Sequence, residues 1–160
     1  MNNMDTQKFL SRYSIGKRYF RGICLNNANL RGAKLTMANL KEADLSGADL
    51  SEAKLNGVDL SQANLSGADL SNADLRSTNL SDVNLIGADL TGAKLGRANL
   101  RRADMRSANL TNADLIGATL DEVEMSGADL TGANVNQSEL SAASSHLGIS
   151  HKWVTWAGSH

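Results

Sequence analysis

The chain has 160 residues, with 16 basic and 17 acidic side chains and a formal net charge of −1. This balance argues against a protein that binds nucleic acid. It also argues against a strong nucleic-acid mimic, which would carry a large negative excess. The single cysteine excludes an internal disulfide scaffold, and a lone thiol fits a reducing cytoplasm. No run approaches the roughly 18 apolar residues of a membrane span. We therefore expect a soluble, cytoplasmic protein that does not contact a membrane.

Residues 1–20 are predicted to form an N-terminal cap that is partly helical. Phe9, Leu10 and Tyr13 would fall on one side of a short helix. Asp5 lies just before this segment, where a carboxylate stabilises the positive end of a helix. We expect the segment to close the open end of the fold that follows.

Residues 21–140 carry a repeat of five residues that never slips. Every fifth position from Leu25 to Leu140 is a central apolar residue, and 21 of these 24 are leucine. The position two residues earlier is alanine at 18 of the 24 sites, and the position directly before the central residue is Asp or Asn at 17. The pattern predicts that the central residue and the residue two positions earlier point inward, and that the Asp or Asn between them faces water.

A period of five matches neither the helix nor the strand, and the load of Asn, Asp, Ser and Gly argues against a continuous helix. If each repeat forms one short extended side and one turn, the chain winds into a coil. Successive coils then hydrogen-bond along the axis at about 4.8 Å spacing. Glycine ends several repeats, where its tolerance of positive φ suits a tight corner.

The tandem motif A(D/N)LXX, as in ANLRG, ADLSG and ADLTG, resembles the pentapeptide repeat family. This resemblance implies an all-β fold, a right-handed quadrilateral parallel β-helix with four repeats per coil. The 24 repeats would then make six coils. The ADLSGADL runs and the lead-in RYSIGKRYFRGICL are similar to cyanobacterial members of the family.

Residues 141–160 break the repeat and are predicted to be a C-terminal cap or a flexible tail. Both tryptophans lie in this segment, where they would cover the last coil or contact a second molecule. We therefore expect a monomer or a weak end-to-end dimer. The three histidines also lie here, without the spacing of a zinc site, so no metal ligand is assigned.

The sequence offers no candidate for catalysis. Cys24 occupies an outward position with no histidine nearby in the sequence, so we expect an ordinary surface residue. The motifs of phosphate-binding loops and of serine hydrolases are absent, and a coil filled with Leu and Ala leaves no substrate pocket. The aspartates recur as a structural row and lack the pattern of calcium-binding solenoids. The sequence therefore predicts a protein that is not an enzyme, with no catalytic residue and no cofactor.

Residues twenty apart should stack on one side of a four-sided coil, and two such ladders differ in charge. The first is rich in acids and amides, and its carboxylates form a candidate acidic face: Asp49, Asp69, Asp89 and Asp129. The second has mixed sign: Lys34, Lys54, Asp74, Lys94, Asp114 and Asn134.

A basic cluster interrupts the polar background of the repeats, within thirteen residues: Lys94, Arg97, Arg101, Arg102 and Arg106. Because arginine makes forked contacts with carboxylates, we hypothesise that this cluster binds an acidic patch of a protein. The alternative is a solvated face that serves solubility.

These features favour a non-enzymatic protein–protein interaction or scaffolding module, with a regulatory role as one form of it. The partner is an unknown protein. The family resemblance supplies two alternatives, a DNA-mimicking inhibitor or protector of DNA gyrase and a regulator of cyanobacterial cell differentiation. The acidic face would serve the first alternative, whereas the basic cluster would interrupt an acidic rod.

Overall fold

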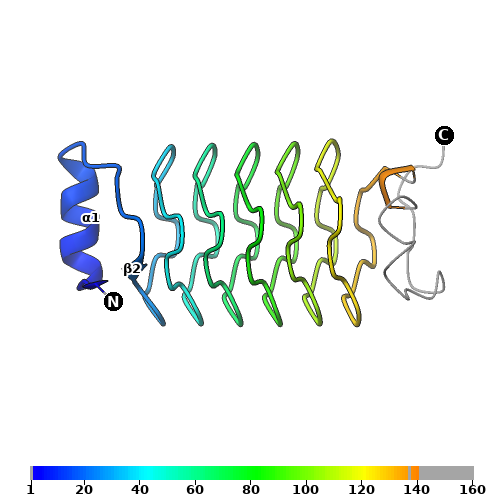
Figure 1. Ribbon diagram of the computed structural model, residues 1–160, viewed down its shortest axis with the longest axis horizontal. Coiled ribbons are helices and arrows are strands. Elements are labelled where there is room, and N and C mark those ends of the chain that lie inside the picture. The colour runs from blue at the N-terminus through cyan, green and yellow to red at the C-terminus, as the bar shows by residue number, and fades with distance from the viewer. Residues whose placement is uncertain (1, 137, 141–160) are drawn as a thin grey trace.

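The computed structural model describes residues 2–136 and 138–140. Within them the chain winds into a rod of stacked coils, and helix α1 (Thr6–Ser14) lies across the N-terminal end (Figure 1). Strands β1 (Asn2–Asn3) and β2 (Ile23–Cys24) pair in parallel beside this helix. The predicted C-terminal cap or tail, 141–160, lies outside the described residues.

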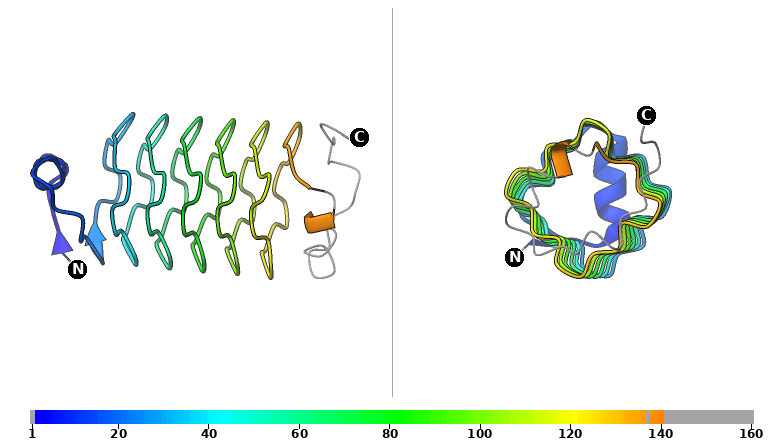
Figure 2. Two further views of the ribbon diagram at one scale, coloured as in Figure 1. Left: turned by 90° about the horizontal axis from the view of Figure 1, so that it is seen from above. Right: turned by 90° about the vertical axis from the view of Figure 1, so that its right-hand side faces the viewer.

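The coils stack with a register of twenty residues. Parallel bridges join residues twenty apart from the pair Tyr19 and Asn39 to the pair Asp114 and Asn134. Four repeats therefore make one coil, and the end-on view shows the coils superimposed as four sides with projecting corners (Figure 2). This register confirms the predicted β-solenoid. Each side contributes one bridged residue per coil, because a corner follows every fifth residue.

The two apolar positions of the repeat point inward, as predicted. The central leucines and most of the alanines two residues earlier are almost fully buried in one continuous core. Thr78 stands where alanine is usual, and its buried hydroxyl donates to the carbonyl oxygen of Leu55 at 3.0 Å. The core therefore contains stacked small and medium side chains, and this polar exception has a hydrogen-bond partner.

The backbone donors of each repeat follow one scheme, which residues 49–53 illustrate. Four of the five N–H groups donate to backbone carbonyl oxygens, on neighbouring coils or within the turn. The fifth belongs to Ser51, directly after the central leucine, and it donates to Oδ1 of Asp49 at 3.0 Å. The Asp or Asn thus closes the corner, as short polar side chains do in Asx turns.

This contact explains the Asp or Asn row of the repeat. Every such residue in this position from Asn29 to Asp129 accepts the N–H two residues later. Where Ser or Thr follows the leucine, its hydroxyl often donates to the same oxygen, as from Ser71 to Asp69 at 2.6 Å. The Asp and Asn side chains face outward, and each accepts the backbone N–H two residues later.

The second residue after each central position adopts a left-handed backbone from Gly22 to Gly132. Many of these residues are not glycine; Glu52 has a φ of 59° and Arg102 a φ of 56°. Such a conformation costs about 1–2 kcal/mol for a residue with a Cβ. The stacking of the coils imposes this corner whether or not the sequence supplies glycine.

The N-terminal cap closes the first coil through aromatic and polar contacts. Phe9 of α1 is fully buried and packs edge-on against Phe20, with the ring centroids 4.7 Å apart. The hydroxyl of Tyr13 donates to the carbonyl oxygen of Thr36 at 2.9 Å. Asp5 caps the helix by accepting the N–H of Gln7 at 3.2 Å, in the place that the sequence predicts.

The expectation that Cys24 is a surface residue is wrong. Cys24 is only 7% exposed, and its thiol donates to Oδ1 of Asn26 at 3.0 Å. The reason is β1, which pairs with β2 and covers this side of the first coil. A two-residue strand of asparagines has no recognisable sequence pattern, so this pairing was not predicted from the sequence.

The left-handed corner is testable with two alanine substitutions. Gly67 has a φ of 64° and no non-neighbouring atom within 4 Å of an added Cβ. Gly67→Ala should therefore lower the free energy of unfolding by about 1 kcal/mol through backbone strain alone. Gly96 lies outside the left-handed region, and an added Cβ would meet its nearest neighbour, the carbonyl oxygen of Ile116, at 3.6 Å.

Gly96→Ala is therefore the control, with an expected change within about 0.5 kcal/mol. Urea unfolding of both variants measures the difference. Equal destabilisation by the two substitutions would contradict this account of the corner.

Candidate functional site

One side of the rod departs from the repeat pattern. We call it the lysine ladder, and the bridges place its members in one line: Lys34, Lys54, Asp74, Lys94, Asp114 and Asn134. Its three lysines are exposed and stand where Asp or Asn is usual. Within the described residues, none of these lysines takes part in an ion pair.

The acids of the lysine ladder offset its charge only in part. Asp74 is 8% exposed, and Arg76 donates to both of its carboxylate oxygens at 2.8 and 2.6 Å. These hydrogen bonds hold the pKa of Asp74 well below its usual range. Asp74 is therefore ionised and neutralised by its own arginine, and it does not compensate the lysines.

The lysines also leave backbone donors without a partner. A lysine ammonium has no acceptor, so it cannot close the corner as Asp or Asn does. Within the described residues, the N–H groups of Thr36, Asn56 and Gly96 accordingly have no hydrogen-bond acceptor. Each of these donors lies two residues after a lysine, so the ladder combines ammonium groups with open N–H groups.

A hollow of about 540 Å³ opens beside this ladder. We call it the Gly96 notch, and it is lined by Asn56, Arg76, Ser77, Gly96, Arg97, Asp114 and Ile116. The corresponding positions of the neighbouring coils carry Arg76 and Ile116, so the missing side chain of Gly96 leaves the space. Gly96 lies outside the left-handed region, so its backbone does not require glycine.

The structure disperses the basic cluster that the sequence analysis proposed. Lys94 lies on the lysine ladder and Arg97 follows it beside the Gly96 notch. The remaining members lie on the next two corners, because thirteen residues span more than half of a twenty-residue coil. Arg106 there donates to both oxygens of Asp104, at 2.8 and 2.7 Å.

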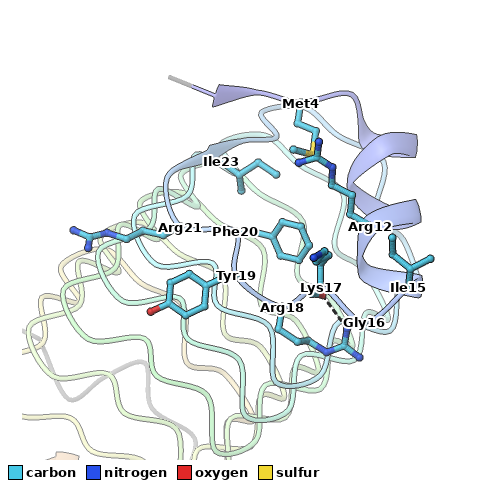
Figure 3. A pocket seen from close by; sticks show the side chains of 10 residues that line it. All are labelled: Met4, Arg12, Ile15, Gly16, Lys17, Arg18, Tyr19, Phe20, Arg21 and Ile23. Atoms are coloured by element: carbon cyan, nitrogen blue, oxygen red, sulfur yellow. Dashed lines mark hydrogen bonds between the residues drawn. The ribbon is translucent and has the colours of Figure 1, made fainter.

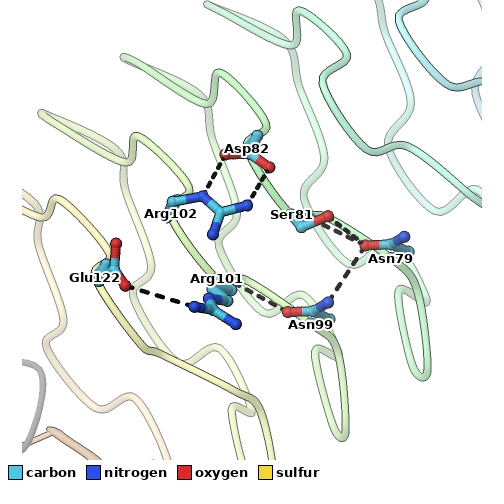
Figure 4. Close-up of polar contacts among 7 residues, drawn as sticks. All are labelled: Asn79, Ser81, Asp82, Asn99, Arg101, Arg102 and Glu122. Carbon is cyan, nitrogen blue, oxygen red and sulfur yellow. Dashed lines mark hydrogen bonds and ion pairs between the residues drawn. The ribbon is translucent and has the colours of Figure 1, made fainter.

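Arg101 and Arg102 are engaged with carboxylates of the neighbouring coils (Figure 4). Arg102 donates to both oxygens of Asp82 at 2.7 and 2.9 Å. Arg101 pairs with the following coil instead, with its Nη2 3.7 Å from Oε1 of Glu122. The cluster thus divides into Lys94 and Arg97, which have no ion pair in the described residues, and three arginines that do.

The candidate acidic face does form one line. We call it the aspartate ladder: Asn29, Asp49, Asp69, Asp89, Asn109 and Asp129. Hydrogen bonds from Ser51 lower the pKa of Asp49, and those from Thr131 lower the pKa of Asp129. The carboxylates of Asp49 and Asp129 are therefore ionised at neutral pH, and each already accepts bonds from its own corner.

A second hollow, of about 550 Å³, lies between α1 and the first coil (Figure 3). Tyr19 at its rim is 81% exposed. The Arg18 guanidinium lies 3.8 Å from the ring centroid of Tyr13 and donates to backbone carbonyls, and Arg21 pairs with Glu42. This hollow was not predicted from the sequence, although basic and aromatic residues that precede the repeats line it.

The described residues contain no group of three His, Cys, Asp or Glu side chains arranged to hold a metal ion. In the same part of the chain, no helix has the length and apolar character needed to cross a membrane.

A comparison with protein families matches the family described as "Pentapeptide repeats" in eight copies, over residues 23–62, 43–82, 60–102, 84–121 and 108–144. The chain belongs to the pentapeptide repeat family. A comparison with curated proteins found no match.

Solved structures of pentapeptide repeat proteins resemble the chain. One from the thylakoid lumen of Arabidopsis thaliana is 28% identical, with 62% of this chain and 70% of that chain covered and a TM-score of 0.60. Rfr23 from the cyanobacterium Cyanothece 51142 is 29% identical, with 83% and 97% covered and a TM-score of 0.54. A third, from Nostoc PCC 7120, is 31% identical, with 89% and 94% covered and a TM-score of 0.36.

In this pentapeptide repeat protein the three lysines of the ladder lack the corner contact that most other repeats use. Proteins often depart from a stabilising local pattern where function requires it. Lys54→Asn should supply an acceptor for the N–H of Asn56. We expect the free energy of unfolding to rise by about 1 kcal/mol, the net value of one such hydrogen bond.

Lys41→Asn is the matched control, because Lys41 follows a central leucine and the N–H of Lys41 is already bound to Asn39. Its stability should not change. Chemical denaturation of both variants gives the comparison, and an unchanged midpoint for Lys54→Asn would refute the capping account.

Proposed function

We propose that this pentapeptide repeat protein is a non-enzymatic protein-binding module whose lysine ladder recognises an acidic segment of a protein partner. One observation carries the proposal: the lysines of the ladder have no ion pair in the described residues, and each precedes an open backbone donor. Both kinds of group favour an anionic ligand.

The dimensions of the ladder suit a short extended segment. The three coils from Lys34 to Lys94 rise about 14 Å, at about 4.8 Å per coil, which is the length of about four extended residues. The coils are joined by continuous hydrogen bonds, so the ladder presents its charges in a fixed line. A rigid surface loses little conformational entropy on binding.

A binding role rather than a catalytic one is supported by the packing. The interior of the described coils is filled by Leu and Ala side chains, and both hollows described above lie on the outside. The Gly96 notch is lined by one hydroxyl and one carboxylate, those of Ser77 and Asp114, but no hydrogen bond joins them within the described residues, and its surface chemistry is that of charge recognition. We also propose a cytoplasmic location, although one similar structure comes from a thylakoid lumen.

A charge reversal tests the proposal. Tagged wild type, Lys54→Glu/Lys94→Glu and Lys8→Glu/Lys41→Glu are used to capture partners from the native cells, at low and high salt. The two variants carry the same change of charge, and only the first alters the lysine ladder. We expect an acidic partner to be lost at high salt and from the ladder variant, but to be kept by the control variant.

A partner retained by both variants would contradict recognition through the lysine ladder. Circular dichroism and thermal unfolding of the variants establish that a lost partner does not reflect a lost fold.

DNA-gyrase binding by mimicry of DNA is the second candidate, favoured by the single line of the aspartate ladder. Two asparagines interrupt this line, and the net charge of the chain is only −1. If the purified protein inhibits gyrase supercoiling, and Asp69→Asn/Asp89→Asn relieves the inhibition, this candidate replaces the first. The alternative role in cyanobacterial cell differentiation stays a prediction from family resemblance.

A further inference from the structure

We infer that the Gly96 notch is a binding site for one carboxylate side chain of the acidic segment, with the N–H of Gly96 and the guanidinium of Arg97 as its donors. This inference rests on the proposed function and adds to it the site at which one acidic side chain of the partner binds.

Neither donor of the notch has a competing partner in the part of the chain that the structure describes. Arg97 is exposed and takes part in no ion pair within the described residues, unlike the other three arginines of the basic cluster. The N–H of Gly96 has no acceptor there, because Lys94 replaces the usual Asp or Asn. A carboxylate can accept from a backbone N–H and a guanidinium together, and such charge-assisted bonds are among the strongest.

The space of the notch depends on the absence of one side chain. On the neighbouring coils the same position carries Arg76 and Ile116, and a side chain of that size at Gly96 would fill the notch. An added Cβ would lie 3.6 Å from the carbonyl oxygen of Ile116 and 3.8 Å from Cγ of Arg76, which is ordinary contact. A larger residue is therefore compatible with the fold but not with a ligand in the notch.

The walls of the notch suit an acidic side chain on an aliphatic stem. Ile116 is 46% exposed and offers an apolar wall to such a stem. Asp114 also lines the notch, but its Oδ1 already accepts the N–H of Ile116 at 3.1 Å. The charged residues at and beside the notch are Arg76, Lys94 and Arg97 against Asp74 and Asp114, so three positive charges face two negative ones.

Fluorescence anisotropy with a labelled twelve-residue peptide rich in glutamate tests the inference. The proteins compared are wild type, Gly96→Leu, Lys94→Asn and the control Ser66→Leu. Ser66 follows a central leucine on another side of the coil, and Ile86 in the next coil shows that this position accepts a branched apolar residue. A variant with Lys34→Glu and Lys54→Glu probes the ladder away from the notch.

We expect Gly96→Leu to weaken peptide binding about tenfold, because it removes the space for a charge-assisted contact. Lys94→Asn should weaken it to a similar degree by capping the N–H of Gly96, and Ser66→Leu should bind as wild type does. All variants should retain the thermal unfolding of a folded solenoid.

The two levels of the proposal fail in different ways. Wild-type affinity in Gly96→Leu, together with weak binding by Lys34→Glu/Lys54→Glu, overturns the notch and leaves the ladder in place. No binding of the peptide to wild type at low salt, or full binding by every variant, overturns the recognition of acidic segments by the lysine ladder as well.

Discussion

The backbone N–H that follows each central leucine is the group on which the surface of this solenoid depends. The other four donors of a repeat are bound by carbonyl oxygens, whereas this one has no backbone acceptor. It must be satisfied by a side chain, by water or by a partner. The row of Asp and Asn meets that need at most corners, and its replacement by lysine creates a side with open donors and positive charge.

The same corner fixes the geometry of the whole rod. A left-handed residue turns the chain after each leucine, and the bonds between coils, such as Leu50 N–H to Asp69 O at 2.7 Å, hold the register. Because the register is twenty residues, side chains far apart in the sequence stand in line along the axis. Surface ion pairs such as that of Arg102 and Asp82 join neighbouring coils, although exposed pairs of this kind contribute little to stability.

The sequence predicts the architecture because the five-residue period is visible along residues 21–140. Inward Leu and Ala, outward polar residues and the helix after Asp5 all follow from spacing and residue type. The burial of Cys24 was missed, because a two-residue strand covers it and such a strand leaves no pattern. The corner contact was missed as well, because the sequence shows that Asp or Asn faces outward but not which donor it accepts.

The candidate site was located only in part for a related reason. Residues adjacent in sequence turn a corner every five positions, so the cluster from Lys94 to Arg106 separates in space. The lysine ladder was visible at a spacing of twenty, yet it was interpreted as a face of mixed sign. Its positive character depends on the pairing of Asp74 with Arg76, a contact that spacing alone does not reveal.

Nuclear magnetic resonance titration of the isotope-labelled protein with the glutamate-rich peptide shows which side of the rod binds an acidic segment. If the lysine ladder binds the peptide, amide shifts change at intervals of twenty residues along it, at 54–57, 74–77, 94–97 and 114–117, with Gly96 among the largest. Changes concentrated on the aspartate ladder or around Tyr19, or spread evenly over all four sides, would contradict it.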